Sequence, residues 1–258
     1  LFSPQAAWRW RFNTSTDTPL PPDEPAGQNP ADGALIHYRL ESAASDVVIE
    51  VLDAAGAVVR RHTSRDLPEG LVEGRNTPDY WIRPHQALAA TTGLHRFVWD
   101  LRHEPPAVAA FSYPIAAIAG ATPRVPRGTL VVPGRYTVRL TVDGVIETAP
   151  LTVRMDPRVT TAPAALAQQY ATARAIDAAL EQVGAALGDA RAAAASGGDR
   201  TALARTTETA LGRTQAQAAQ LRALVDAADL PPTPQMLTAW RQVSADIEAA
   251  LAAWAQGR

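Results

Sequence analysis

The 258-residue sequence contains neither cysteine nor lysine. The absence of cysteine excludes disulfides, a thiolate nucleophile and cysteine-ligated zinc. The absence of lysine excludes a lysine Schiff base, and all 24 basic residues are arginine. With a formal net charge of -2, the chain has no global basic field that would attract nucleic acid or anionic lipid. No run of about 18 apolar residues occurs, so no membrane span is predicted.

Residues 1–33 are predicted to form an extended arm followed by a proline-rich linker. The segment Trp8-Arg9-Trp10-Arg11-Phe12 alternates, which places three aromatic rings on one face of an extended chain. We expect Trp8, Trp10 and Phe12 to dock against a partner domain, as in an edge strand or a packed arm. The alternative is an aromatic platform for a sugar or a peptide.

Residues 34–155 show the two-residue periodicity of half-buried strands. In the stretch 136–142, Tyr136, Val138, Leu140 and Val142 share one face, whereas two threonines and an arginine occupy the other. Similar stretches, separated by Gly, Pro and Asp turns, occur at 34–40, 47–51, 58–61, 94–101 and 145–153. They predict an antiparallel β-sandwich of about seven strands, of the immunoglobulin or fibronectin III type. Residues 63–92 and 103–130 break this rhythm and are predicted to be long loops, where binding tends to occur.

Residues 159–258 are alanine-rich and show helical periodicity. Apolar residues recur at three- and four-residue steps in three segments, which predicts an antiparallel three-helix bundle. We expect interruptions at Gly188 and at 196–198, and a second helix from about 200 to 228. Thr233, which precedes Pro234, is expected to cap the last helix. The overall prediction is therefore an α+β protein, a sandwich followed by a bundle.

Catalytic and metal-binding motifs are absent from the sequence. Its histidines show no H-x-H or H-E-x-x-H spacing, so we predict no metal or cofactor; they are His37, His62, His85, His95 and His103. No G-x-S-x-G elbow, phosphate loop or calcium loop occurs. Four carboxylates lie near loops or strand ends, namely Asp32, Asp79, Asp100 and Glu104. A hydrolase with a loop-borne site is a third hypothesis, which requires His85, His103 and Glu104 to converge.

Aromatic residues in the two long loops suggest another function. Tyr80 and Trp81 lie in the first loop, and Phe111 and Tyr113 in the second. Exposed loop aromatics stack on sugar rings, so a carbohydrate-binding module is the alternative hypothesis. The simpler interpretation is that these rings fold back onto the edge of the sandwich.

Several segments resemble a bacterial family. These are 28–34, 48–56, 93–102 (Gly-Leu-His-Arg-Phe-Val-Trp-Asp-Leu-Arg), Pro133-Gly134-Arg135-Tyr136 and Asp156-Pro157-Arg158. Over residues 1–158 they resemble the C-terminal region of large exported proteins with sortilin-like, BNR-repeat β-propellers, often labelled glycosyl hydrolases. The repeats themselves are absent, since Trp99-Asp100 occurs once and no period of about 40 residues is visible.

The resemblance implies an accessory role and no catalytic residue. We expect a non-catalytic region that holds or docks an upstream propeller or a companion chain. The implied location is periplasmic or secreted. Because the chain opens at Leu1 without methionine, we expect it to be a piece of a longer protein.

Overall fold

The computed structural model describes residues 1–11, 21, 23–25, 27, 30–68, 70–108, 111–114, 120–197 and 200–256. The chain divides into two compact units. The strand unit comprises Leu1–Glu104, Ser112–Val125 and Leu130–Val159, and the helical unit comprises Pro105–Phe111, Pro126–Thr129 and Thr160–Arg258. The predicted α+β class is confirmed.

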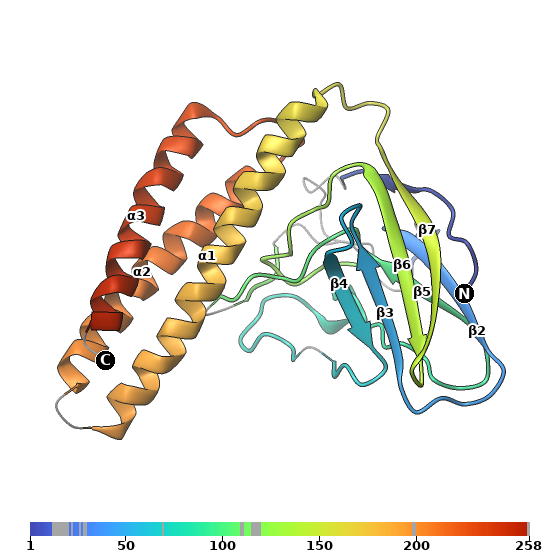
Figure 1. The fold of residues 1–258 in the computed structure, drawn as a ribbon, viewed down its shortest axis with the longest axis horizontal. Helices are drawn as coiled ribbons and strands as arrows, with labels where there is room; N and C mark the ends of the chain where they lie inside the picture. Colours follow the sequence, from blue (N-terminus) through green and yellow to red (C-terminus); the bar gives the residue numbers. More distant parts are fainter. Residues whose placement is uncertain are drawn as a thin grey trace. The chain divides into compact units, whose positions relative to one another are not determined.

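The strand unit contains two sheets (Figure 1). Its strands are β1 (Ala7–Arg9), β2 (Ala34–Leu40), β3 (Val47–Leu52), β4 (Val58–Thr63), β5 (Gly93–Trp99), β6 (Gly134–Val142) and β7 (Val145–Met155). Five of them form one mixed sheet in the order β1-β7-β6-β3-β4, and β2 pairs with β5. Within the larger sheet β1 runs parallel to β7, whereas the other neighbours are antiparallel. This sheet curls as a half-barrel, and the immunoglobulin or fibronectin III type stays a prediction.

One hydrophobic core contains side chains from both sheets. On β6, Tyr136, Val138 and Leu140 are buried as the alternation predicts, and the larger sheet also contributes Ile49 and Val51 of β3. The two-stranded sheet adds Ile36, Tyr38, Phe97 and Trp99. The indole Nε1 of the fully buried Trp99 donates to the carbonyl of Arg102 at 3.0 Å, so the ring is buried without an unsatisfied donor.

The N-terminal arm contacts both sheets. The Phe2 amide donates to the carbonyl of His37 on β2 at 3.0 Å. Further along, Ala7 pairs with Val153 and Trp8 with Arg154, in parallel register with β7. The arm therefore runs alongside β7, and its strand β1 is an outer strand of the larger sheet.

A tight turn precedes β2 and requires glycine. Gly33 has a φ of 139°, and a Cβ added there would lie 2.0 Å from the carbonyl oxygen of Trp99. Only a residue without a side chain fits this close approach of two backbones.

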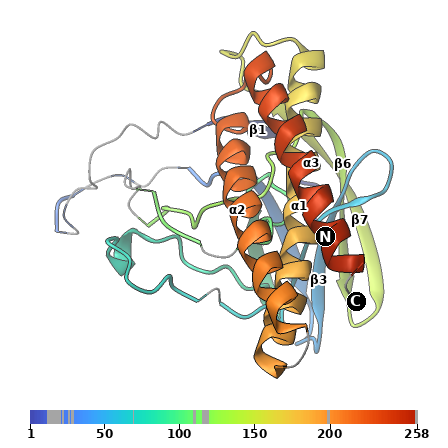
Figure 2. The same ribbon diagram turned by 90° about the vertical axis from the view of Figure 1, so that its left-hand side faces the viewer.

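The helical unit contains α1 (Pro163–Ser196), α2 (Thr201–Val225) and α3 (Pro234–Gln256). Consecutive helices run in opposite directions and lie side by side (Figures 1 and 2). Their shared core includes Ile176, Leu180, Leu211 and Ile247. The Thr233 side chain accepts from the Met236 amide at 3.2 Å, which confirms the predicted cap.

The predicted break at Gly188 is wrong. The helix α1 continues through this position to Ser196. A single glycine costs a helix only about 1 kcal/mol relative to alanine. The buried Leu187 and Ala190 on either side hold the helix against the core, which offsets that cost.

Two segments of the second long loop belong to the helical unit. In the first, the side-chain amide Nε2 of Gln215 donates to the carbonyl of Ala107 at 3.4 Å, and Val108 packs against the helical core. A Cβ added to Gly184 of α1 would lie 3.0 Å from the Cβ of Ala107. The second segment ends at Thr129, which is buried. The helical unit is thus three helices and two extended segments.

Candidate functional site

The loop aromatics lie on segments that backbone hydrogen bonds join. Tyr80 and Trp81 belong to a short 3-10 helix, η1 (Asp79–Trp81), whose carbonyls accept from the amides of Gly120 at 3.2 Å and Thr122 at 3.0 Å. Within the second loop, Ser112 pairs with Val125, next to Tyr113. The strand unit therefore gathers the segments that carry three of the four predicted aromatics, whereas Phe111 belongs to the helical unit.

The two aromatic rings of η1 do not form a flat platform. Tyr80 is 55 % exposed and Trp81 is half-buried, and their ring planes cross at 86° with centroids 6.1 Å apart. Sugar-stacking platforms need rings whose faces are presented together, so this pair offers one exposed ring. Carbohydrate binding by Tyr80, Trp81, Phe111 and Tyr113 stays a prediction.

The predicted docking residues of the arm differ in their surroundings. Trp8 is 46 % exposed, and the guanidinium of Arg154 lies 5.8 Å from its ring centroid. Trp10 is half-buried, and Phe12 lies outside the described residues. Docking through these three aromatics stays a prediction.

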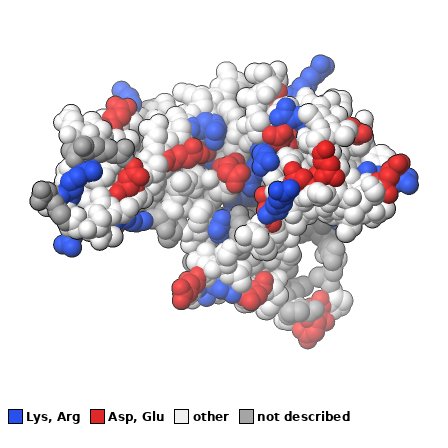
Figure 3. All heavy atoms as spheres, turned by 60° about the horizontal axis from the view of Figure 1, so that its bottom comes forward, with Lys and Arg blue, Asp and Glu red and all other residues white. Residues whose placement is uncertain are grey.

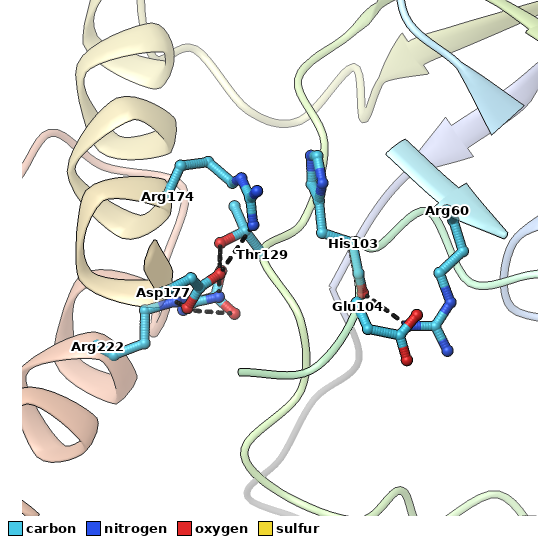
Figure 4. A network of polar contacts seen from close by, with 8 residues as sticks. Arg60, His103, Glu104, Thr129, Arg174, Asp177 and Arg222 are labelled. Atoms are coloured by element: carbon cyan, nitrogen blue, oxygen red, sulfur yellow. Dashed lines mark hydrogen bonds and ion pairs between the residues drawn. The ribbon is translucent and has the colours of Figure 1, made fainter. Parts of the chain in front are cut away.

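The residues of the hydrolase hypothesis surround an arginine of β4. Arg60 donates through Nη1 to the carbonyl of His103 at 3.2 Å and pairs with the Glu104 carboxylate at 2.8 Å (Figure 4). His103 is buried, whereas His85 is exposed. Because Arg60 neutralises Glu104, this carboxylate is poorly suited to act as a general base. Catalysis by His85, His103 and Glu104 stays a prediction.

His62 of β4 is a functional candidate that sequence reasoning did not single out. Arg60 donates through Nε to its Nε2 at 3.3 Å, and its ring lies 4.6 Å from that of Phe97. Burial, followed by the positive charge of Arg60, lowers the pKa of His62 to about 4; Asp100 and Asp66 oppose this, and His85 adds to it. The imidazole is therefore neutral at pH 7, with Nε2 already engaged as an acceptor. That engagement makes His62 a weak proton acceptor for catalysis.

Two further carboxylates near the loops contact arginine side chains. Arg83 pairs with Asp32 at 3.4 Å, and Arg75 contacts Asp79. Over the described residues, no group of three or more His, Asp or Glu side chains is placed to hold a metal ion. The residues that the structure describes thus offer no ligand set that would suit a metal centre.

The most completely buried polar cluster lies in the helical unit. Arg222 of α2 donates through Nε to Oδ1 of Asp177 on α1 at 2.7 Å (Figure 4). Its Nη2 donates to the Thr129 hydroxyl at 2.9 Å, and that hydroxyl donates to Oδ2 of Asp177 at 2.5 Å. All three residues are at most 2 % exposed. A closed ring of satisfied groups is a structural arrangement, because no donor or acceptor is left to approach a substrate.

The sequence contains a signal for the cluster of Asp177 and Arg222. Asp177 directly follows Ile176 on the apolar stripe of α1, and Arg222 directly follows Leu221 on that of α2. Charges on the buried faces of two neighbouring helices indicate a pair. Thr129 carried no such signal, because its segment was predicted to be a loop.

The surface charge and the hydropathy of the helices bear on two kinds of partner, nucleic acid and membrane. On the face drawn in Figure 3, basic and acidic side chains are interspersed, without a continuous basic area among the described residues. No described helix combines the length and the apolarity needed to cross a bilayer. A nucleic-acid groove normally needs an extended basic surface, and this face does not provide one.

A comparison with models of known protein families, and another with curated proteins, found no match for this chain.

Proposed function

We propose that this chain is a non-catalytic docking region of a larger exported bacterial protein with a sortilin-like, BNR-repeat β-propeller. One observation carries the proposal. Phe2 of the arm and Val145 and Ile146 of β7 are 51 %, 69 % and 60 % exposed. We refer to these three residues as the apolar end of β7. Large aliphatic and aromatic side chains exposed together are typical of a surface that another protein covers.

Chain geometry supports treating these residues as one surface. Leu1 lies against Glu147 of β7, which brings Phe2 beside the start of that strand. The register of the arm, in which Ala7 pairs with Val153, continues the same parallel alignment. The three apolar side chains therefore lie at one end of the sheet, with Val145 and Ile146 on opposite faces of β7.

The polar clusters support a non-catalytic role. Asp177, Arg222 and Thr129 satisfy one another, and Arg60 engages His62 and Glu104. A catalytic constellation needs ionisable groups that are free to exchange protons with a substrate. These clusters instead use their charged groups to hold the fold.

The proposal also includes the fold type of the strand unit and the cellular location. Both sheets contribute to one core, which supports an immunoglobulin- or fibronectin III-like sandwich. The resemblance of residues 1–158 to the C-terminal regions of propeller proteins supports a periplasmic or secreted location and a propeller or companion chain as partner.

Sedimentation of the purified 258-residue chain tests the docking surface. With its partner absent, we expect the apolar end to drive concentration-dependent association, and the variant V145S/I146S to remain monomeric over the same range. Leu224→Ser is the matched control, because Leu224 is 52 % exposed on α2 of the helical unit. A strictly monomeric native chain, or association that L224S abolishes equally well, would contradict the proposal.

A further inference from the structure

The far end of β7 presents a different surface. Trp8 pairs with Arg154 across the β1–β7 ladder, and Arg135 of β6 lies opposite Thr152 of β7. Residues 152 and 154 point to the same side of the strand, so Arg135 and Arg154 are diagonal neighbours on the outer face of the sheet. Diagonal neighbours are separated by about 7–8 Å. We refer to Trp8, Arg135 and Arg154 as the cationic row.

Among the described residues, the two arginines of the row have no counter-charge. Both are exposed, and neither forms an ion pair with any residue of the described chain. Nearby arginines behave differently: Arg139 on β6 pairs with Glu50 at 2.7 Å, and Arg158 with Asp156 at 2.5 Å. The guanidinium N–H groups of the row are thus available to an external anion.

The Trp8 ring organises one of these cations. The Arg154 guanidinium lies 5.8 Å from its ring centroid, within cation–π distance, while 46 % of Trp8 remains exposed. The ring limits the conformations of Arg154 and still presents an apolar surface to a ligand. An aromatic surface beside a guanidinium suits a ligand that combines an apolar ring face with an anionic group.

We propose that the cationic row binds an acidic polysaccharide, that is, a polymer of sugars that carries carboxylate or sulfate groups. A sugar ring would lie against Trp8, and its anionic groups would accept hydrogen bonds from Arg154 and Arg135. Ile146 of the apolar end is eight residues from Arg154 on the same strand, about 26 Å away. The site therefore goes beyond the proposed docking function and does not depend on it.

The residues around the row favour a polysaccharide over other polyanions. Along the outer face of β7, the side chains before Arg154 are Thr148, Pro150 and Thr152, all exposed. Between Ile146 and Arg154 this face carries no large apolar side chain of the kind that forms the centre of a protein–protein interface. Two cations are also too few for nucleic acid, whose binding depends on many phosphate contacts.

Affinity electrophoresis of the purified chain tests the site. We expect polygalacturonate, heparin or both to retard the native protein, and neutral dextran to leave it unretarded. In R135Q/R154Q the apparent affinity should fall about tenfold or more, and W8A should weaken binding without changing net charge. The matched control is R205Q/R213Q, which removes the same charge from exposed positions of α2 and should bind like the native protein.

Several outcomes would overturn the proposal. They are no retardation by either acidic polymer, equal retardation by dextran, or equal losses in R135Q/R154Q and R205Q/R213Q. Binding of poly-glutamate or double-stranded DNA that is as strong as that of the acidic polysaccharides, and equally dependent on the row, would assign the site to another polyanion. Unchanged thermal unfolding of the variants would show that any loss comes from the site and not from misfolding.

Discussion

Arg222 and Asp177 form an ion pair inside the helical unit, with 2.7 Å between Nε and Oδ1. Their side chains are 2 % and 1 % exposed. Taking two charges out of water is costly, so such a pair persists only where further hydrogen bonds complete it. Thr129 provides two of these bonds, and Arg174 and Asp226 add weaker contacts at 3.5 Å.

Removing one partner of this pair should destabilise the protein strongly. Asp177→Asn keeps the shape but leaves the Arg222 charge buried without its carboxylate, and we expect a loss of about 3 kcal/mol or more in the free energy of unfolding. Guanidinium titration followed by far-ultraviolet circular dichroism measures this loss. Replacing both partners by leucine should recover much of it, because no uncompensated charge remains. A loss below about 1 kcal/mol in D177N would show that the pair contributes little.

We expect Thr129 to contribute to the stability of the protein through its hydroxyl group. Thr129→Val preserves the side-chain shape but removes the donor to Asp177 and the acceptor for Arg222. We expect a loss of about 1–3 kcal/mol, since both charged groups would each lose one buried hydrogen bond. Thr161→Val is not a suitable control, because Thr161 also bonds a backbone carbonyl. Thr148→Val, on the exposed face of β7, should change stability by less than about 0.5 kcal/mol.

The periodicity of the sequence predicted most of the elements. Alternation at 136–142 predicted β6 and its buried face, because one wall of a sheet facing a core requires an apolar residue at every second position. The three helices followed from three- and four-residue spacing in the same way, and Thr233 marked the start of α3.

What the sequence did not reveal depends on contacts between distant segments. Ala107 and Thr129 lie in a loop without periodicity, yet they pack with α1 and α2 because Gly184 leaves space and Asp177 and Arg222 need a hydroxyl. The parallel pairing of β1 with β7 likewise links residues 146 positions apart. Such pairings are chosen by the whole fold, so a local pattern carries little information about them.

His62 should make stability depend on pH between about 4 and 6.5. Burial and the adjacent Arg60 lower its pKa in the folded chain to about 4, whereas an unfolded histidine titrates near 6.5. Between these values the unfolded state binds more protons, so the free energy of unfolding falls as the pH falls. The change in the free energy of unfolding is at most about 3.4 kcal/mol; this stability is fully present above pH 6.5 and is lost as the pH falls to about 4.

Urea titrations at pH 7, 5.5 and 4.5 measure the contribution of His62. Carboxylates also titrate at acid pH, so the native protein is compared with His62→Gln, whose side-chain oxygen still accepts from Arg60. As the pH falls, we expect the free energy of unfolding of the native protein to decrease more than that of H62Q. His95→Gln is the control, because His95 is half-buried on the neighbouring sheet and its ring contacts the Thr91 carbonyl. A difference that does not vary with pH would contradict the assignment.

Two glycines of α1 should respond in opposite ways to a larger side chain. Gly188 has no atom within 4 Å of an added Cβ, so Gly188→Ala should stabilise the helix by about 0.5–1 kcal/mol. At Gly184 an added Cβ would lie 3.0 Å from the Cβ of Ala107, and Gly184→Leu has to displace that segment. We expect G184L to lower the free energy of unfolding by about 1–3 kcal/mol, despite the better helix propensity of leucine. Thermal unfolding of both variants checks this, and the side-chain amide of Gln215, which donates to the Ala107 carbonyl, should exchange faster only in G184L. If G184L were as stable as G188A, the segment around Ala107 would not be packed against α1.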